Sequence, residues 1–473
     1  MTTLTLNEIL SRLKDLAGPG GYLEDRVDVE PFEVDFRKLY KGATPLVLRP
    51  DSTERISQIM KFCSETGTAV VPAGGNTGYC GGATPDESGE QIVLSLARLN
   101  KIRSVDPMNY TLTADAGCTL VQVQEAAEHV QRLFPLSLGA EGSCHLGGNL
   151  STNAGGTAVL RYGNTRDLVL GIEAVLPDGR IVENLKGLRK DNTGYDWKNL
   201  FIGAEGTLGI ITGAVLKLFP TPRSYGTAMV ALRDLDASVE LLSMLRERSG
   251  DAVTTFELIP RLAMELACRH IDGVKDPLDQ PYDWYALMEL SCATDEAQTQ
   301  ELLETLLGEA LESEVIQDAA LANSGAQREA MWRMRENIPE AQSHEGPSIK
   351  HDVSVQVSRM PAFIREATTL VKELVPGCRV VSYGHLGDGN VHFNLSPAEG
   401  DRDPVFLEQA KRVNHAVHEV IASYGGSISA EHGIGRLKRD ELAVYKSEAE
   451  IQLMRTIKAA LDPSGIMNPG KVL

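Results

Sequence analysis

YGHLGDGNVHFN, residues 383–394, is the stretch that decides how the second half of the chain folds. Asp388-Gly389 is a strong signal for a two-residue hairpin turn, so we predict a strand on each side of it. Such a turn would place His385 directly opposite His392, with Cβ atoms roughly 4.5–5.5 Å apart on one face. Two imidazoles at that spacing can share a divalent ion. The alternative is that these are two ordinary strand histidines.

Glu431 is the nearest plausible third ligand for such an ion. A set of two histidines and one carboxylate leaves a coordination position open for water or substrate, as catalytic zinc sites do. Zinc is our first choice, although manganese, cobalt or iron would suit the same ligands. His432 follows Glu431 in the chain and would stand beside the metal as a free base.

The size and charge of the chain narrow its possible functions. With 473 residues it exceeds one core of the usual size, so we expect two domains or one domain with a large insertion. A formal net charge of −19 disfavours nucleic acid and anionic membranes as partners.

The seven cysteines are scattered singly, which argues against a disulfide framework or an iron–sulfur cluster. With no signal-peptide pattern and no long apolar run, we expect a cytoplasmic protein, or an organellar one that has lost a presequence.

Hydrophobic periodicity predicts the main elements. Phe219–Arg223 contains two prolines spaced by one residue and should mark a boundary. After it, alternating strands and helices predict a sheet that helices cover on one face, in an α+β arrangement. We predict helices over 6–16, 52–65, 119–133, 236–248, 296–312, 324–341 and up to 374, and strands over 69–71, 91–96, 172–182 (a hairpin), 227–232, 284–290 and 350–357.

Two glycine-dense segments, 72–78 and 139–163, should bind a ligand. Neither matches the G-x-G-x-x-G pattern of a dinucleotide-binding crossover. Consecutive small residues nevertheless let several backbone N–H groups approach one anion. Two such loops in one domain suit an extended ligand with a pyrophosphate better than a lone phosphate, although surface turns are the alternative.

Six motifs, in this order, resemble the FAD-linked 2-hydroxy acid dehydrogenases of the vanillyl-alcohol-oxidase superfamily. The branch includes D-2-hydroxyglutarate dehydrogenase, D-lactate dehydrogenase and the glycolate oxidase flavoprotein subunit. The motifs are PAGGNTG (72–78), GSCHLGGNLSTNAGG (142–156), GAEGTLGIIT (203–212), YGHLGDGNVHFN (383–394), AEHGIG (430–435) and DPSGIMNPGK (462–471).

The resemblance implies an α+β fold, in which a two-part FAD-binding domain of the vanillyl-alcohol-oxidase type carries an inserted α+β cap that binds substrate. The implied parts are an N-terminal helical segment (1–40), the FAD-binding domain (41–222), the substrate domain with the metal hairpin (223–428) and a C-terminal segment that returns to the FAD domain (429–473).

The resemblance also implies which residues bind FAD. None of residues 72–82 is a histidine, so the flavin should be held noncovalently, unlike in relatives that attach it there. Glu205, Gly209 and Ile210 should approach the adenosine half of the cofactor. The full implied set is Pro72, Gly74, Gly75, Asn76, Thr77, Gly78, Gly142, Ser143, Gly148, Asn149, Thr152, Gly155, Glu205, Gly209, Ile210 and Asn468.

In the same family an arginine, a threonine and a lysine bind the carboxylates of the substrate. These positions are Arg335, Pro339 and Lys350 here, so a hydroxyl donor is missing, and Asn394 of the hairpin motif should also contact substrate. The metal would chelate the 2-hydroxy acid and His432 would remove its hydroxyl proton as general base. The α-hydrogen would then leave as hydride to flavin N5.

We therefore predict FAD-dependent oxidation of a D-2-hydroxy acid to the 2-oxo acid, with D-2-hydroxyglutarate or a D-malate-like dicarboxylate favoured. D-lactate and glycolate are alternatives, and a flavin-free zinc hydrolase or a noncatalytic ligand-binding protein are more distant ones. The electron acceptor would be electron-transfer flavoprotein, a quinone or a cytochrome. We also expect a homodimer with no transmembrane segment.

Overall fold

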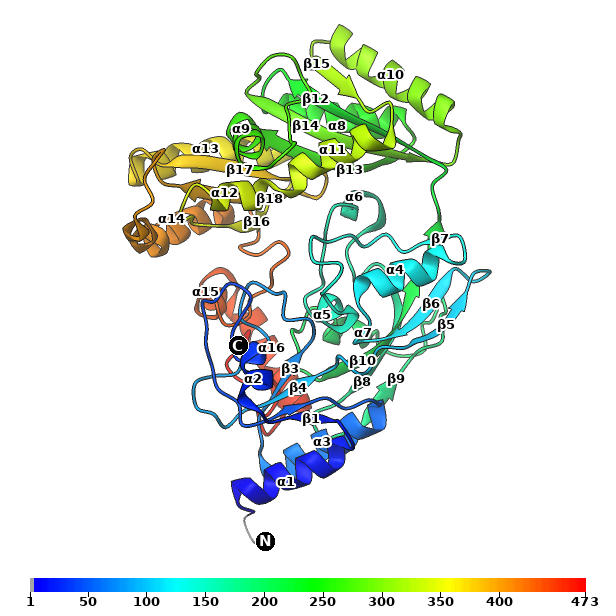
Figure 1. Cartoon of the computed structure of the whole chain (residues 1–473), viewed down its shortest axis with the longest axis vertical. Coiled ribbons are helices and arrows are strands. Elements are labelled where there is room, and N and C mark those ends of the chain that lie inside the picture. The colour runs from blue at the N-terminus through cyan, green and yellow to red at the C-terminus, as the bar shows by residue number, and fades with distance from the viewer. Residues whose placement is uncertain (1–3) are drawn as a thin grey trace. The chain divides into compact units, whose positions relative to one another are not determined.

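The computed structural model describes residues 4–473, which form two compact units (Figure 1). The first unit contains residues 4–155, 164–221 and 432–473. The second contains residues 156–163 and 222–431, and its longer segment begins within the proline-containing stretch 219–223. Both units mix helices and sheets, and the predicted α+β class is confirmed.

The first unit contains two main sheets. In the four-stranded sheet, of order β1-β2-β4-β3, strands β2, β4 and β3 are parallel. The five-stranded sheet, of order β5-β6-β10-β8-β9, is antiparallel, and β7 pairs separately with β11. The strands are β1 (Tyr22–Leu23), β2 (Val47–Leu48), β3 (Val70–Ala73), β4 (Ile92–Ser95), β5 (Ile102–Asp106), β6 (Thr111–Asp115), β7 (Arg132–Leu133), β8 (Val169–Val175), β9 (Ile181–Glu183), β10 (Ile210–Lys217) and β11 (Phe219–Pro220).

Helices α1 (Leu6–Ala17) and α3 (Thr53–Thr66) confirm two sequence predictions. Leu13 of α1 is buried in the same core as Ile56 of α3, so the N-terminal segment belongs to this unit. The helix predicted over 119–133 is shorter, because α4 stops at Glu128 and the chain enters β7. The remaining helices are α2 (Arg26–Val29), η1 (Glu30–Phe32), α4 (Leu120–Glu128), α5 (Leu146–Ser151), α7 (Lys198–Phe201), α15 (Arg439–Tyr445) and α16 (Glu448–Leu461).

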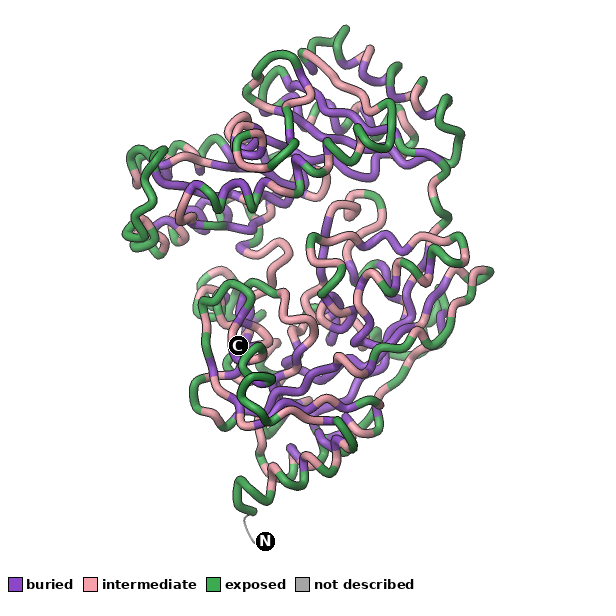
Figure 2. The backbone as a smooth tube through the Cα atoms, in the orientation of Figure 1, coloured by how far each residue is buried: buried purple, intermediate pink, exposed green. Residues whose placement is uncertain are grey.

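The second unit is built on one antiparallel sheet of seven strands, ordered β15-β12-β14-β13-β17-β18-β16. Strand β13 was not predicted, although its eight positions are all buried, and the burial of the central strands is visible in Figure 2. The strands are β12 (Ser224–Leu232), β13 (Val253–Pro260), β14 (Trp284–Cys292), β15 (Ile316–Leu321), β16 (Asp352–Ser354), β17 (Arg379–His385) and β18 (Asn390–Ser396).

Helices cover both faces of this sheet, so the predicted one-sided cover is wrong. Phe256 and Leu258 of β13 share a core with α8, α10, α13 and α14, whereas Ile259 shares the opposite core with α9, α11 and α12. Alternate strand residues point to opposite faces, and here both faces carry buried apolar side chains. The helices are α6 (Val159–Tyr162), α8 (Ala237–Arg248), α9 (Arg261–His270), α10 (Glu296–Glu312), α11 (Gly325–Glu336), α12 (Ile338–Ser343), η2 (Val357–Arg359), α13 (Met360–Leu374), η3 (Leu386–Asp388), η4 (Pro404–Gln409) and α14 (Ala410–Ser423).

The helix predicted over 324–341 is interrupted between α11 and α12. Pro339 lacks the N–H that a continuous helix would donate to the carbonyl of Arg335, which explains the break. Within residues 4–473, the structure contains no helix with the length and apolar character needed to cross a membrane.

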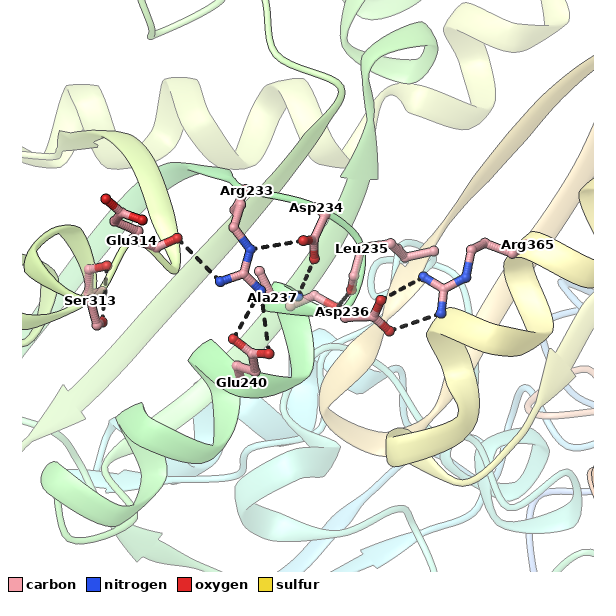
Figure 3. Close-up of polar contacts among 11 residues, drawn as sticks. Arg233, Asp234, Leu235, Asp236, Ala237, Glu240, Ser313, Glu314 and Arg365 are labelled. Carbon is pink, nitrogen blue, oxygen red and sulfur yellow. Dashed lines mark hydrogen bonds and ion pairs between the residues drawn. The ribbon is translucent and has the colours of Figure 1, made fainter.

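Exposed ion pairs surround the start of α8 (Figure 3). Arg233 donates to Asp234 at 2.8 Å and to Glu240 at 3.2 Å, and Arg365 of α13 binds Asp236 through two bonds of 2.9 Å. Ion pairs this exposed contribute little to stability, because water and salt screen them. This network connects the start of α8 to α13 at the surface. It consists of ion pairs between side chains of the protein, so we do not assign it to the active site.

Candidate active site

A cavity in the first unit is formed by both glycine-dense segments. The first segment follows β3 and the second leads into α5. The two loops meet at one site, so they are more than isolated surface turns. The lining residues are Pro72, Ala73, Gly74, Gly75, Asn76, Thr77, Gly78, Cys80, Gly81, Gly82, Ala83, Leu96, Cys144, His145, Gly147, Gly148, Asn149, Ser151, Thr152, Glu205, Gly206, Gly209, Ile210, Ile211 and His432.

The loops approach one another so closely that side chains are excluded. A Cβ on Gly75 would lie 1.9 Å from the carbonyl oxygen of Ser143, and one on Gly147 would lie 2.9 Å from the Cβ of Ala116. Real Cβ contacts do not occur at these distances. Glycine is therefore required at position 75 for the two loops to come together, and at position 147 for the second loop to pack against Ala116.

The polar groups of the cavity suit FAD. Nδ1 of His145 is buried and has no hydrogen-bond partner among the described residues. Burial lowers the pKa of this histidine, which favours the neutral imidazole, and a neutral ring can donate or accept a bond. The small residues of the first loop leave its backbone N–H groups accessible to a pyrophosphate. An imidazole nitrogen without a partner in the described part of the chain and a loop of small residues are therefore suited to hold a polar, phosphate-containing cofactor such as FAD.

Most predicted FAD residues line this cavity, but four do not: Gly142, Ser143, Gly155 and Asn468. Ser143 instead supplies the carbonyl against which Gly75 packs. Asn468 donates from Nδ2 to the carbonyl oxygens of Gly82 and Glu205, each at 2.9 Å, and so joins two lining segments. His145 and Cys80 also line the cavity and are not among the predicted residues, although both lie in or beside the glycine motifs.

His432, the predicted base, also lines the cavity. The carboxylate of Glu205 accepts the N–H groups of Ile434 and Gly435, both at 2.8 Å, and the carbonyl of Cys80 accepts that of Arg436 at 2.8 Å. Burial raises the pKa of Glu205, although the two backbone bonds oppose that rise. The carboxylate of Glu205 thus holds the segment that follows His432, and because Glu205 also lines the cavity, its approach to the adenosine half of FAD stays a prediction.

In the second unit, the predicted hairpin is present but its register differs. His392 of β18 pairs with Tyr383 of β17, whereas His385 pairs with Glu257 of β13. The turn is longer than two residues because a 3₁₀ turn, η3, precedes Gly389, which has φ of 84°. A shift of two residues keeps each side chain on its face of the sheet. The two imidazoles therefore still meet, with ring centroids 5.5 Å apart.

His385, His392 and Glu431 bring three possible ligand atoms within 4.8 Å of one another. Glu431 accepts the N–H of Gly156 through Oε1 at 2.8 Å, and its Oε2 lies 4.0 Å from Nε2 of His385. Two imidazole nitrogens and a carboxylate oxygen form a donor set that a divalent transition metal accepts. The residues that the sequence singled out are therefore close enough to share one ion.

Glu257, which sequence analysis missed, lies behind His385. It is fully buried, and its Oε1 lies 2.5 Å from Nδ1 of His385, while its Oε2 accepts a bond of 2.7 Å from Nε of Arg335. Burial alone would raise the pKa of Glu257, but Arg335 and His385 outweigh burial and lower it to about 2. Burial opposes a charge on His385 as well, yet Glu257 raises the pKa of the imidazole to about 9.

Asp352 plays a similar part beside His392, and it too was missed. Its Oδ1 lies 3.8 Å from Nδ1 of His392 and accepts a bond of 2.8 Å from Asn390. Its Oδ2 accepts the backbone N–H of Glu431 at 2.9 Å. The buried carboxylate of Asp352 thus lies beside His392 and binds the backbone of Glu431, which are two of the three candidate ligands. Asp352 is an acidic residue within the predicted strand 350–357, and that position was the feature of the sequence from which it could have been identified.

The predicted substrate residues differ in their surroundings. Arg335 is 6% exposed, and its guanidinium lies over the ring of Tyr383 at 4.9 Å. Asn394 is buried and donates to Gln342 at 3.0 Å, while its Oδ1 has no partner among the described residues. Lys350 is exposed, just before β16. Arg335 and Asn394 are therefore part of the second unit's interior, and Lys350 is at its surface.

Comparisons with known proteins agree with this architecture. Residues 44–184 match the family described as "FAD binding domain", and residues 221–472 match "FAD linked oxidases, C-terminal domain". The structure is similar to that of p-cresol methylhydroxylase with a TM-score of 0.77, at 15% identity, over 98% of this chain and 96% of the other. Identity that low supports the fold alone, and the predicted vanillyl-alcohol-oxidase type of fold is confirmed.

Two curated relatives cover nearly the whole chain. A mitochondrial D-2-hydroxyglutarate dehydrogenase of Arabidopsis thaliana is 38% identical over 98% of this chain and 81% of its own length. A Schizosaccharomyces pombe protein with D-lactate dehydrogenase and mitochondrial in its name is 36% identical over 94% of this chain and 85% of its own. The predicted cytoplasmic location is wrong on this comparison, since both relatives are named mitochondrial. At this identity and coverage, the chain belongs to the FAD-linked oxidase family, together with the D-2-hydroxyglutarate dehydrogenases.

Proposed function

We propose that this protein oxidises a dicarboxylic D-2-hydroxy acid, with D-2-hydroxyglutarate favoured, to the 2-oxo acid. The observation that supports this best is the cluster of His385, His392 and Glu431, whose ligand atoms lie within 4.8 Å, in a family of FAD-linked dehydrogenases. A 2-hydroxy acid presents a hydroxyl and a carboxylate that can chelate one such ion in a five-membered ring. FAD, when bound in the first unit, supplies the acceptor for two electrons and the α-hydrogen.

The metal would be held by the two imidazoles and the carboxylate of Glu431. A divalent ion there would act as a Lewis acid and lower the pKa of the substrate hydroxyl. Zinc is the first choice for these ligands, and manganese, cobalt or iron are the alternatives. Glu257 would keep His385 oriented through Nδ1, leaving Nε2 for the ion.

His432 would act as general base. It takes the proton of the substrate hydroxyl on an imidazole nitrogen as the 2-oxo group forms, a role that typically contributes 10²–10⁴-fold in rate. Its place on the lining of the FAD cavity supports this assignment, because the base has to work beside the flavin. Glu205 and Cys80 hold its segment in place through backbone bonds.

Arg335, Lys350 and Asn394 would recognise the carboxylates. The guanidinium of Arg335 uses Nε and one terminal nitrogen on Glu257, and further N–H donors are available for a substrate oxygen. D-lactate is the second candidate substrate, favoured by the relative named for it and by Pro339, which supplies no hydroxyl at the family's threonine position. The homodimer and the electron acceptor remain predictions.

A dye-linked oxidation assay over both enantiomers of 2-hydroxyglutarate, malate and lactate, with glycolate, tests this proposal. We expect the highest kcat/KM for a D-dicarboxylate, and the His432→Ala enzyme should lose at least about 10²-fold in the rate of flavin reduction while it keeps its metal. A colourless protein with no activity on the panel would refute the proposal and favour the zinc hydrolase. A preference for D-lactate would keep the reaction and change the substrate.

A further inference from the structure

Glu257 connects the arginine to a candidate metal ligand within the second unit. It lies in the middle of β13, with no exposed surface, and pairs with His385 across the strands. One carboxylate oxygen faces Nδ1 of His385 at 2.5 Å, and the other accepts a hydrogen bond of 2.7 Å from Nε of Arg335. The Nη2 atom of Arg335 forms an ion pair with the same oxygen at 2.7 Å. The three side chains form one continuous hydrogen-bonded row.

Arg335 is also connected to the second histidine, His392, through the ring of Tyr383. Its guanidinium lies over the ring of Tyr383 at 4.9 Å, and that ring lies 5.1 Å from the imidazole of His392. Both histidines thus have a neighbour that contacts Arg335. Removing the arginine would leave the Glu257 carboxylate buried without its main counter-charge, which is strongly destabilising.

The same helix provides an internal comparison. Arg328, seven positions before Arg335 on α11, binds the buried Glu289 of β14 at 2.6 Å and lies over the ring of Tyr225 at 4.3 Å. Glu289 also accepts bonds from Thr227 and Trp332, and within residues 4–473 no histidine binds it. Arg328 and Glu289 thus form the same kind of ion pair between α11 and a buried strand glutamate. The pair of Arg335 and Glu257 differs because Glu257 also binds a histidine, His385.

We propose that Glu257 is a positioning residue that sets the metal affinity of the site, and that Arg335 acts on the metal through it. This inference rests on the proposed function. With Nδ1 held by Glu257, the imidazole of His385 is fixed in orientation, and its Nε2 is the nitrogen left to face Glu431. Arg335 balances the carboxylate, so the arginine supports the metal site in addition to any contact with substrate.

Zinc affinity is the direct test, because it does not depend on turnover. The full-length protein with FAD bound is stripped of metal, and zinc binding is measured by competition with a chromophoric chelator. Glu257→Gln, which keeps the size of the side chain, should weaken zinc binding roughly 10–100-fold, the usual effect of losing a partner behind a ligand. The controls Glu289→Gln and Arg328→Met should bind zinc as the wild type does.

Combining the variants tests the link to Arg335. Arg335→Met alone should weaken zinc binding, and the double variant Glu257→Gln/Arg335→Met should lose less than the sum of the single effects, because both changes act on one network. Far-UV circular dichroism and bound FAD report folding. Should Glu257→Gln fail to fold, Glu257→Asp keeps the charge, withdraws it from His385 and should still weaken zinc binding.

The outcomes separate this inference from the proposed function. Wild-type protein that binds no zinc, manganese, cobalt or iron would overturn the metal part of the proposed function together with this inference. Wild-type protein that binds zinc as tightly as a folded Glu257→Gln or Glu257→Asp protein would overturn the inference alone. Additive losses in the double variant, or equal losses in the Glu289 control, would likewise overturn it.

Discussion

The ring of Tyr79 packs edge-on against the imidazole of His432, with 4.6 Å between centroids and an angle of 87° between planes. Tyr79 belongs to the segment that continues the first glycine loop, so the cofactor loop itself contacts the proposed base. Aromatic pairs of this geometry contribute about 0.5–1.5 kcal/mol beyond burial. The contact restricts the orientation of the ring that must accept the substrate proton.

Tyr79→Ala should therefore slow flavin reduction by substrate roughly 3–10-fold, the kinetic equivalent of that contact energy. Tyr79→Phe keeps the edge-on ring and should react at nearly the wild-type rate in stopped-flow measurements at 450 nm. Phe36→Ala is the matched control, since Phe36 packs on Tyr79 at 5.6 Å. A slow Tyr79→Phe enzyme would instead assign a role to the hydroxyl.

Gly75→Ala should abolish FAD binding. The added Cβ would lie 1.9 Å from the carbonyl oxygen of Ser143, so the two loops would have to separate. The flavin content of the purified protein, released by acid precipitation, measures this effect and tests noncovalent attachment at the same time. Gly139→Ala adds the same methyl group in open space and should keep its FAD. Full FAD content in the Gly75 variant would contradict the observed loop packing.

The sequence predicted where the glycine loops and the histidine hairpin lie in the chain, but it did not predict the strand register of the hairpin. The Asp388-Gly389 turn located the hairpin, but it could not show that η3 would lengthen the turn and shift the register by two residues. The histidines still meet because that shift preserves the face of each strand. The predicted direct pairing of the two histidines was therefore wrong, and their rings still lie close because side chains alternate with a period of two along a strand.

Glu257 was missed for a different physical reason. Its importance depends on pairing between β13 and β17, which are separated by more than 100 residues and give no local signal. The run Val253–Pro260 is apolar and β-branched around a single acid, so a buried strand could have been predicted there. That its carboxylate contacts both Arg335 and His385 could come only from the folded chain.

His392→Ala should lower bound metal and activity together and leave FAD in place. The ligand set belongs to the second unit and the FAD cavity to the first, so the two losses should be independent. Metal analysis of the purified variant, beside its flavin spectrum, measures both. Loss of FAD in parallel with metal would indicate general unfolding. Full activity after chelation would remove the metal from the mechanism.

Lys471→Met should stabilise the protein near neutral pH. Burial lowers the pKa of Lys471 to about 8, from its ordinary value of 10.5. Between these values the unfolded chain binds more protons than the folded one, so the free energy of unfolding of the wild type rises with pH in that window. Below pH 8 the buried charge is fully destabilising, and the methionine variant should gain about 1–3 kcal/mol there.

Thermal melts at pH 7 and pH 10 check this expectation. The gain in the Lys471→Met protein should shrink at the higher pH, where the wild-type side chain is largely neutral. Lys411→Met, at an exposed helical position, controls for the added methionine. Equal melting temperatures of wild type and Lys471→Met at pH 7 would show that burial does not penalise this ammonium group.

Arg335→Met should change substrate choice, provided that its effect on metal binding is removed by saturating zinc. A hydrogen bond to a charged group contributes about 1.5–3 kcal/mol, so a lost contact with the distal carboxylate should reduce kcat/KM roughly 10–150-fold for D-2-hydroxyglutarate and D-malate. D-lactate has no second carboxylate and should lose little. Arg328→Met, which breaks the comparison pair on the same helix, should leave the ratio of the two substrates unchanged. Equal losses in kcat/KM for all three acids, with zinc bound, would mean that Arg335 contacts the carboxylate that they share or acts only through Glu257. Arg335 would then give no support to the proposed preference for dicarboxylates.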